Sequence, residues 1–165
     1  ADALLGAVSR ERALEILKDS RIGSYGAATL TLALLLRVSL LSQLGFDDWL
    51  PFLLAPSLGR LGPLWLLTVV GHAAPNQCKN KDFMGVGRSR AACATLFMLV
   101  ACATMLGVAP NQWPRVAAAW ITTALVTIYV GRLARRRLGG ITGDLLGAAE
   151  QIGEIGILLV FAYAT

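Results

Sequence analysis

Charged residues are scarce in this chain of 165 residues. Asp, Glu, Lys and Arg together make up 15% of it, whereas 56% of the residues are hydrophobic. An ordinary soluble domain contains about 25% charged residues. The mean hydropathy of +0.63 points the same way. The composition therefore argues against a water-soluble globular protein.

Metal-binding patterns built from cysteine and histidine are also missing. The three cysteines, Cys78, Cys93 and Cys102, show no C-x-x-C or zinc-finger spacing, and His72 is the only histidine. Zinc sites need several such ligands at short, regular spacing. We therefore expect Cys93 and Cys102 to be packing residues within an apolar run.

Alternating segments typical of transmembrane β-strands are absent, and the apolar residues instead form long continuous runs. A run of about 20 residues is long enough to cross the ~30 Å hydrocarbon core of a membrane as a helix. We predict an all-α integral membrane protein with about five transmembrane helices, forming one membrane domain over 1–165. The predicted spans are 24–45, 49–71, 91–109, 113–131 and 145–165.

Basic residues occur in alternate connections between these spans. They are abundant before the first span, between the second and third, and between the fourth and fifth, but the other two connections have none before Arg115. By the positive-inside rule, the N-terminus and the basic loops face the cytoplasm or an organellar matrix or stroma. We expect a bacterial or organellar inner membrane. The net charge of +5 follows from this rule, and no nucleic-acid partner is needed to explain it.

A short amphipathic helix is predicted over 9–18, within an interfacial segment that ends at residue 22. Ser9 can cap it, Glu11 lies in its first turn, and Ala13, Ile16 and Leu17 form one apolar face. We expect this helix to lie on the membrane surface before the bundle of 23–165.

Four charged residues lie inside the predicted spans and away from their first turns, where an unpaired charge costs about 2.5 kcal/mol or more. They are Arg37, Arg60, Glu150 and Glu154. One interpretation is that two Arg–Glu pairs lock the bundle together. The other is that these side chains line a polar cavity. Gly143 and Gly147 share a helical stripe with the two glutamates, which favours a groove that a polar ligand can enter.

The segment "RRRLGGITGD" (135–144) precedes the last span. Its glycines leave backbone N–H groups open at a helix start, where the dipole and the arginines favour an anion such as phosphate. Asp144 can hold a divalent cation that bridges phosphates. A positive loop with a helix cap is the simpler alternative.

The segment "LKDSRIGSYGA" (17–27) is predicted to lie at the same membrane surface. Lys18 and Arg21 can bind phosphate oxygens, and Asp19 can ligate a metal or orient an arginine. Gly23 and Gly26 permit close approach of another group to the backbone. Together the two segments suit metal-assisted transfer of a phosphate-linked group to an alcohol, on a substrate partly held in the bilayer.

Two long segments resemble the cobalamin synthase family, also called adenosylcobinamide-GDP ribazoletransferase. They are "SRERALEILKDSRIGSYGA" (9–27) and "LGGITGDLLGAAEQIGEIGILL" (138–159), and "LGR" at 58–60 also matches. The resemblance is weak over 72–115. It implies an integral membrane, Mg²⁺-dependent enzyme that transfers cobinamide phosphate from its GDP ester to α-ribazole or its phosphate and releases GMP.

The resemblance also implies roles for individual residues. Those expected to act in catalysis are Lys18, Asp19, Arg21, Arg60, Asp144 and Glu154. Those expected to bind the nucleotide-linked corrinoid or α-ribazole are Ser20, Gly23, Gly139, Gly140, Thr142, Gly143 and Gly147. The expected Mg²⁺ ligands are Asp2, Asp19 and Asp144.

The family's acidic motif is represented only by its tail, Ala1 and Asp2. The rest of that motif and the spans before it are not in this sequence, so we expect an upstream part or a second chain to supply them. A catalytically inactive accessory subunit of a larger membrane complex is the alternative function, and a transporter is a third. Contact with membrane lipid is expected, and a homo-oligomer is compatible with the sequence.

Overall fold

The computed structural model of the protein describes residues 2, 10–17, 19, 21–45, 48–70 and 87–163. Lys18, Ser20, His72 and Cys78 lie outside the described residues, as does most of the polar loop over 72–90. The elements of the described part are α2 (Arg10–Ile16), α3 (Ser24–Gln43), α4 (Trp49–Val69), α5 (Arg88–Val108), the 3-10 turn η3 (Pro110–Gln112), α6 (Trp113–Leu138) and α7 (Gly143–Tyr163).

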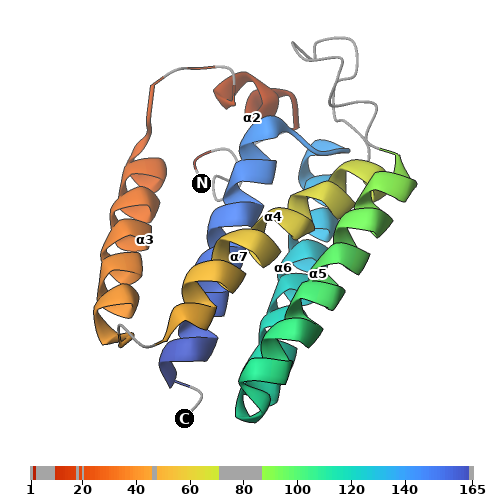
Figure 1. The fold of residues 1–165 in the computed structure, drawn as a ribbon. Helices are drawn as coiled ribbons and strands as arrows, with labels where there is room; N and C mark the ends of the chain where they lie inside the picture. The colour runs from red at the N-terminus through yellow and green to blue at the C-terminus, as the bar shows by residue number, and fades with distance from the viewer. Residues whose placement is uncertain are drawn as a thin grey trace.

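Five of these helices are long and apolar enough to cross a membrane. They run alternately up and down in Figure 1. The prediction of an all-α membrane protein with five spans is therefore confirmed. The upper end in Figure 1 gathers α2, the first turns of α3, α5 and α7, and the last turns of α4 and α6.

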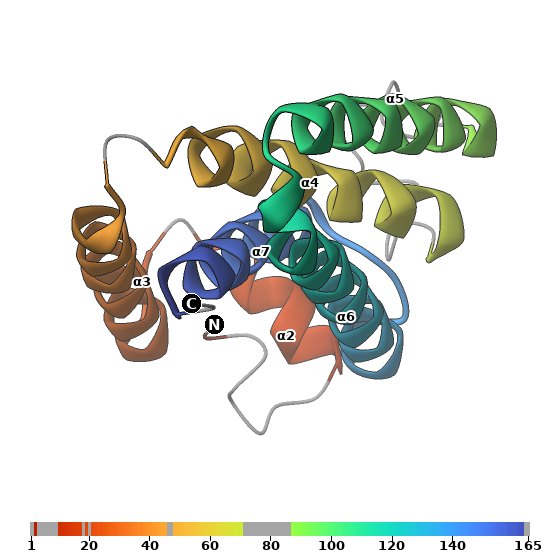
Figure 2. The same cartoon turned by 60° about the horizontal axis from the view of Figure 1, so that its bottom comes forward.

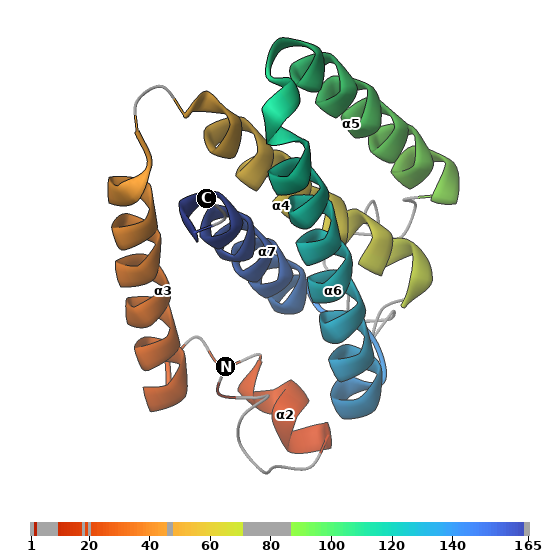
Figure 3. The ribbon, with the colours of Figure 1, turned by 90° about the horizontal axis from the view of Figure 1, so that it is seen from below.

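Helix α7 occupies the middle of the bundle. Viewed from below, it lies between α3, α4 and α6 (Figure 3), and Figure 2 shows α5 outside them, beside α4. The closest packing joins α4, α6 and α7 to one another, whereas α3 packs mainly against α7. Residues of α7 are thus placed to meet side chains from three other helices.

The predicted span over 113–131 is too short, because α6 continues to Leu138. Arg132 and Arg135–Arg137, expected in a loop, lie on the last turns of this helix. Arginine is a good helix former, and cations at a helix C-terminus interact favourably with its dipole. The helix therefore continues beyond the point where the apolar run stops.

The short helix α2 begins at Arg10, has Glu11 in its first turn as predicted, and contacts α6. Ala13 is buried, and Ile16 and Leu17 pack beside it, so the predicted apolar face is confirmed. This face covers an apolar cluster at the end of the bundle where the arginines of the last turn of α6 lie, called the charged end below. The buried members of that cluster are Ala13, Leu66, Val130, Ala134, Leu138, Ile141, Leu145 and Ala149.

A second apolar cluster fills the other half of the bundle, where α4, α6 and α7 supply most of its side chains. By contrast, Leu40 is the only buried residue of α3. Leu32, Leu35 and Val38 are among its exposed apolar side chains. A helix with apolar residues on all sides is typical of a membrane span in contact with lipid.

Two glycines let α4 and α7 cross closely. A Cβ atom on Gly59 would lie 2.7 Å from Cγ of Glu154 and 3.4 Å from the carbonyl oxygen of Glu150. Opposite it, a Cβ on Gly153 would lie 3.6 Å from Cα of Gly59. Small residues at such a crossing allow backbone contact between membrane helices.

We predict that Gly59→Ala destabilises the bundle by about 1–3 kcal/mol, because the added methyl group overpacks the crossing. Gly107→Ala in α5 is the matched control, since no described atom lies within 4 Å of the added Cβ. Unfolding in a detergent titration measures both. Equal stability of the two variants would contradict the close crossing.

Candidate active site

Arg37 of α3 forms an ion pair with Glu154 of α7. The Arg37 side chain is 28% exposed and the Glu154 side chain 12% exposed, so both are mostly buried between the helices. A charge within a membrane span is costly unless it has a partner. This pair gives α3 its only ion pair to α7 among the described residues, and it supports the interpretation that Arg–Glu pairs lock the bundle.

A second ion pair joins α4 to α7. Nε of Arg60 lies 3.2 Å from Oε1 of Glu150, and an Nη1 hydrogen bond of 3.3 Å reaches the carbonyl oxygen of Pro56. The Arg60 side chain is 65% exposed, far more than that of Arg37. It therefore retains N–H donors for another acceptor. Both intramembrane arginines are thus paired with a glutamate of α7, as the bundle-locking interpretation expects, and the polar cavity stays a prediction.

Gly143 and Gly147 lie on the same stripe of α7 as these glutamates. A Cβ atom on either glycine would meet no described atom within 4 Å. Unlike Gly59, neither glycine is explained by helix packing in the described part of the chain. The groove beside the α7 backbone stays a prediction.

The turn between α6 and α7 is shaped by two of its predicted residues. Gly139 has a left-handed conformation (φ 72°), and its N–H donates to the carbonyl oxygen of Arg135, which ends α6. Thr142 begins α7 because its Oγ1 accepts the Leu145 N–H at 3.4 Å. Thr142 is therefore the N-cap of α7. Asp144 lies in the first turn, is exposed and does not cap the helix. Gly140 is buried in this turn.

Asp19 and Arg21 form a compact pair at the surface. Nε and the backbone N–H of Arg21 donate to Oδ1 of Asp19 at 3.2 and 3.0 Å, and Nη2 donates to Oδ2 at 3.0 Å. The side-chain hydrogen bonds of Arg21, then its backbone N–H, hold the pKa of Asp19 below its ordinary value of 3.8. The contact is therefore complete at neutral pH and is lost only in acid, as the pH falls through the lowered pKa.

Asp2 lies over the first turn of α3. Its Oδ2 accepts the N–H of Gly23 at 3.2 Å and the N–H of Gly26 at 3.0 Å. A Cβ on either glycine would come within 2.3 Å of a carboxylate oxygen. The predicted close approach at these glycines is confirmed, and the group that approaches is the chain's own carboxylate. The sequence offered no signal for this partner.

The predicted residues thus occupy one end of the bundle and its adjoining interior. Asp19, Arg21 and the 139–144 turn lie at the end of the helices where α2 sits (Figure 1), and Arg60 lies deeper, on α4. In the described ranges, no three His, Cys, Asp or Glu side chains form a group that could hold a metal ion by themselves. Lys18 and Ser20 lie outside the described residues.

Comparison with known proteins agrees with this arrangement. The family model described as cobalamin-5-phosphate synthase matches residues 1–162. The chain belongs to this family. Two curated relatives named adenosylcobinamide-GDP ribazoletransferase are similar to nearly the whole chain. The one from Polaromonas sp. is 37% identical and the one from Bradyrhizobium diazoefficiens 39% identical, each over 98% of this chain.

A third relative of the same name, from Clostridium botulinum, is 33% identical over 96% of the chain. The matches cover 64%, 61% and 62% of these three relatives, so the chain spans less than two thirds of their length. No solved structure matches the chain. The family assignment confirms the resemblance seen in the two long segments.

We predict that Arg37→Met and Glu154→Gln each destabilise the bundle by about 2.5 kcal/mol or more, because each leaves the other charge unpaired in a span. The double variant should lose less than the sum, because it retains no charge there. A double-mutant cycle of unfolding free energies tests this. Additive losses would show that the two side chains do not stabilise each other.

Proposed function

We propose that the natural protein containing this chain is an adenosylcobinamide-GDP ribazoletransferase. It would transfer cobinamide phosphate from the GDP ester to a free ribose hydroxyl of α-ribazole, or of its phosphate, and release GMP. Family membership and the names of the relatives support this proposal. The structural observation behind it is that Arg21, held by Asp19, and the glycine-rich turn before Asp144 lie at the same end of the bundle.

In this reaction the ribazole hydroxyl attacks the phosphorus next to cobinamide, and the bond to the GMP oxygen breaks. Negative charge is distributed over the phosphoryl oxygens during the transfer. Arg21 supplies a guanidinium for these oxygens, and Asp19 fixes its direction through the contacts described above. Asp19 thereby acts as a positioning residue through Arg21.

Arg60 would bind a second acceptor on the substrate, since its guanidinium is exposed although Glu150 neutralises it in part. Glu154 differs, because it is paired with Arg37 and largely buried. We assign Glu154 to holding α3 in place beside the site. The open backbone at Gly143 and Gly147 gives a substrate room to reach α7.

Mg²⁺ fits the donor set of this end of the bundle. Proteins usually hold Mg²⁺ through one or two carboxylates together with substrate phosphates and water. Asp144 is exposed in the first turn of α7 and is the carboxylate best placed for this, while Asp19 is bonded to Arg21 and Asp2 to the α3 backbone. Bound there, the ion would neutralise charge on the phosphates.

The charged end of the bundle would face the cytoplasm of a bacterium, or the equivalent side of an organellar inner membrane. The arginines on the last turns of α6 support this orientation through the positive-inside rule. A nucleotide-linked substrate would then reach the site from water, while its corrinoid part lies against the bilayer.

We predict different effects for the two aspartates in an assay of Mg²⁺-dependent GMP release by the complete natural protein. Asp19→Asn should lower the rate by about 10–100-fold, as expected when a supporting hydrogen bond is lost, and leave the Mg²⁺ requirement unchanged. Asp144→Asn should raise the Mg²⁺ concentration that gives half of the maximal rate.

The matched control is Glu15→Gln, which removes an exposed carboxylate of α2 paired with Arg12 and should leave the rate unchanged. An unchanged Mg²⁺ requirement in Asp144→Asn would contradict its assignment as a ligand. If the intact wild-type protein releases no GMP with Mg²⁺ and both substrates, the transferase proposal fails and the accessory-subunit alternative is favoured.

A further inference from the structure

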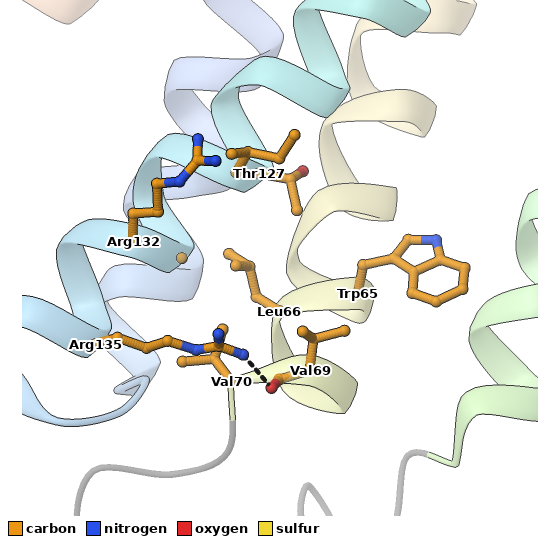
Figure 4. A pocket seen from close by; sticks show the side chains of 9 residues that line it. Trp65, Leu66, Val69, Val70, Thr127, Arg132 and Arg135 are labelled. Atoms are coloured by element: carbon orange, nitrogen blue, oxygen red, sulfur yellow. Dashed lines mark hydrogen bonds between the residues drawn. The ribbon is translucent and has the colours of Figure 1, made fainter.

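A pocket of about 290 Å³ lies between α4 and α6, apart from the candidate active site. No residue of α7 lines it, whereas both Arg–Glu pairs of the candidate site involve α7. Figure 4 shows Leu66, Val69 and Val70 on the α4 side, with Arg135 reaching across from α6 to Val69. Arg132 extends along α6, and the Trp65 indole points away from the two arginines. Its walls are thus mainly apolar, and its charged side chains are both arginines.

Gly131 keeps the two helices close at the floor of this pocket. A Cβ atom there would lie 3.0 Å from Cδ2 of Leu66 and 3.5 Å from Cγ2 of Val70. The helices therefore meet at Gly131, and the larger side chains on either side of it enclose the space. The hollow is a consequence of this packing and needs no movement of a helix to form.

The two arginines are one turn apart on α6. Nη2 of Arg135 donates to the carbonyl oxygen of Val69 at 2.6 Å, which satisfies a group left open at the end of α4 and holds the side chain over the pocket. Arg132 is exposed and makes no hydrogen bond or ion pair to another described residue. None of the described residues that line the pocket is acidic, so its described lining has a net positive charge.

We propose that this pocket binds an anionic phospholipid. Arg132 and Arg135 bind the phosphate, and one acyl chain lies against the apolar wall formed by Trp65, Leu66 and Ile128. The site is at the right level of the membrane, because it lies at the end of α4 and near the end of α6, where a span meets the headgroups. Arginine binds phosphate oxygens in bidentate fashion, and basic pockets between spans are typical lipid-headgroup sites.

The charge and the apolar wall together identify the ligand class. A free phosphate would use the arginines and leave the wall uncovered, whereas an acyl chain of a neutral lipid would cover the wall and leave the arginines unpaired. Only an amphipathic anion satisfies both features. The site is independent of the transferase proposal and survives if that proposal fails.

Trp65 lines the α4 side of the pocket while its indole Nε1 donates to Oγ1 of Thr95 on α5 at 3.0 Å, so its fluorescence reports on a lipid at that side. We would place the complete natural protein in nanodiscs containing phosphatidylglycerol or phosphatidylcholine with brominated acyl chains, which quench a tryptophan on contact. The Trp65→Phe variant gives the quenching that arises from the other tryptophans, and the difference belongs to Trp65. We expect stronger quenching by the anionic lipid.

Two arginine variants test the charge. Arg132→Gln should weaken the preference for phosphatidylglycerol about fivefold, the effect of one basic side chain at an anionic surface. Arg135→Gln should act similarly, but it also removes the contact with Val69, so Arg132→Gln keeps the test valid if Arg135→Gln does not fold. The matched control, Arg136→Gln, changes an arginine of the same helix that does not line the pocket and should behave as wild type.

Equal quenching of Trp65 by the two lipids would overturn the proposal, because it would mean that the pocket meets only bulk lipid. An equal loss of preference in Arg136→Gln would also overturn it, since the effect would then come from general surface charge. If inorganic phosphate abolished the preference while leaving neutral-lipid quenching unchanged, the arginines would bind a free anion, and the lipid assignment would be wrong.

Discussion

The need to neutralise charge inside the membrane constrains this structure more than any other requirement. Glu150 and Glu154 lie on one side of α7, a helix long and apolar enough to span a membrane, and each meets an arginine from a different helix. Because an unpaired charge in a membrane span is costly, these contacts favour an arrangement in which α3 and α4 both lie beside α7. For α3, which buries only Leu40, the pair with Glu154 is a large part of its attachment.

The same placement creates the candidate active site. Helix α7 lies between α3, α4 and α6 (Figure 3). Its first turn lies at the end of the bundle where the α2–α3 connection places Asp19 and Arg21 (Figure 1). The cluster under α2 supports this end, because Leu145 of α7 packs with Ala13 of α2. The apolar cluster thus supports the polar residues at this end of the bundle. The Arg60–Glu150 pair places further charged groups between α4 and α7.

Much of the site was predictable because its residues lie close together in two sequence segments. The stripe of Gly147, Glu150 and Glu154 follows from helical periodicity, and the glycines at 23 and 26 indicated a close backbone approach. The partner of those glycines was not predictable, because Asp2 is more than twenty residues away and meets them through a hydrogen bond. The pocket beside Arg132 was missed for the same reason: its two walls belong to different helices.

Hydrophobic length and charge placement are properties of consecutive residues. The order of residues is therefore enough to predict the membrane class, the number of spans and the end of the bundle that is charged. Only the packed helices show which arginine pairs with which glutamate, that Thr142 rather than Asp144 caps α7, and that Gly59 faces α7 while an added Cβ on Gly143 meets no described atom within 4 Å. These depend on how helices distant in sequence cross, and a periodic pattern specifies a helix face without naming the neighbour that it meets.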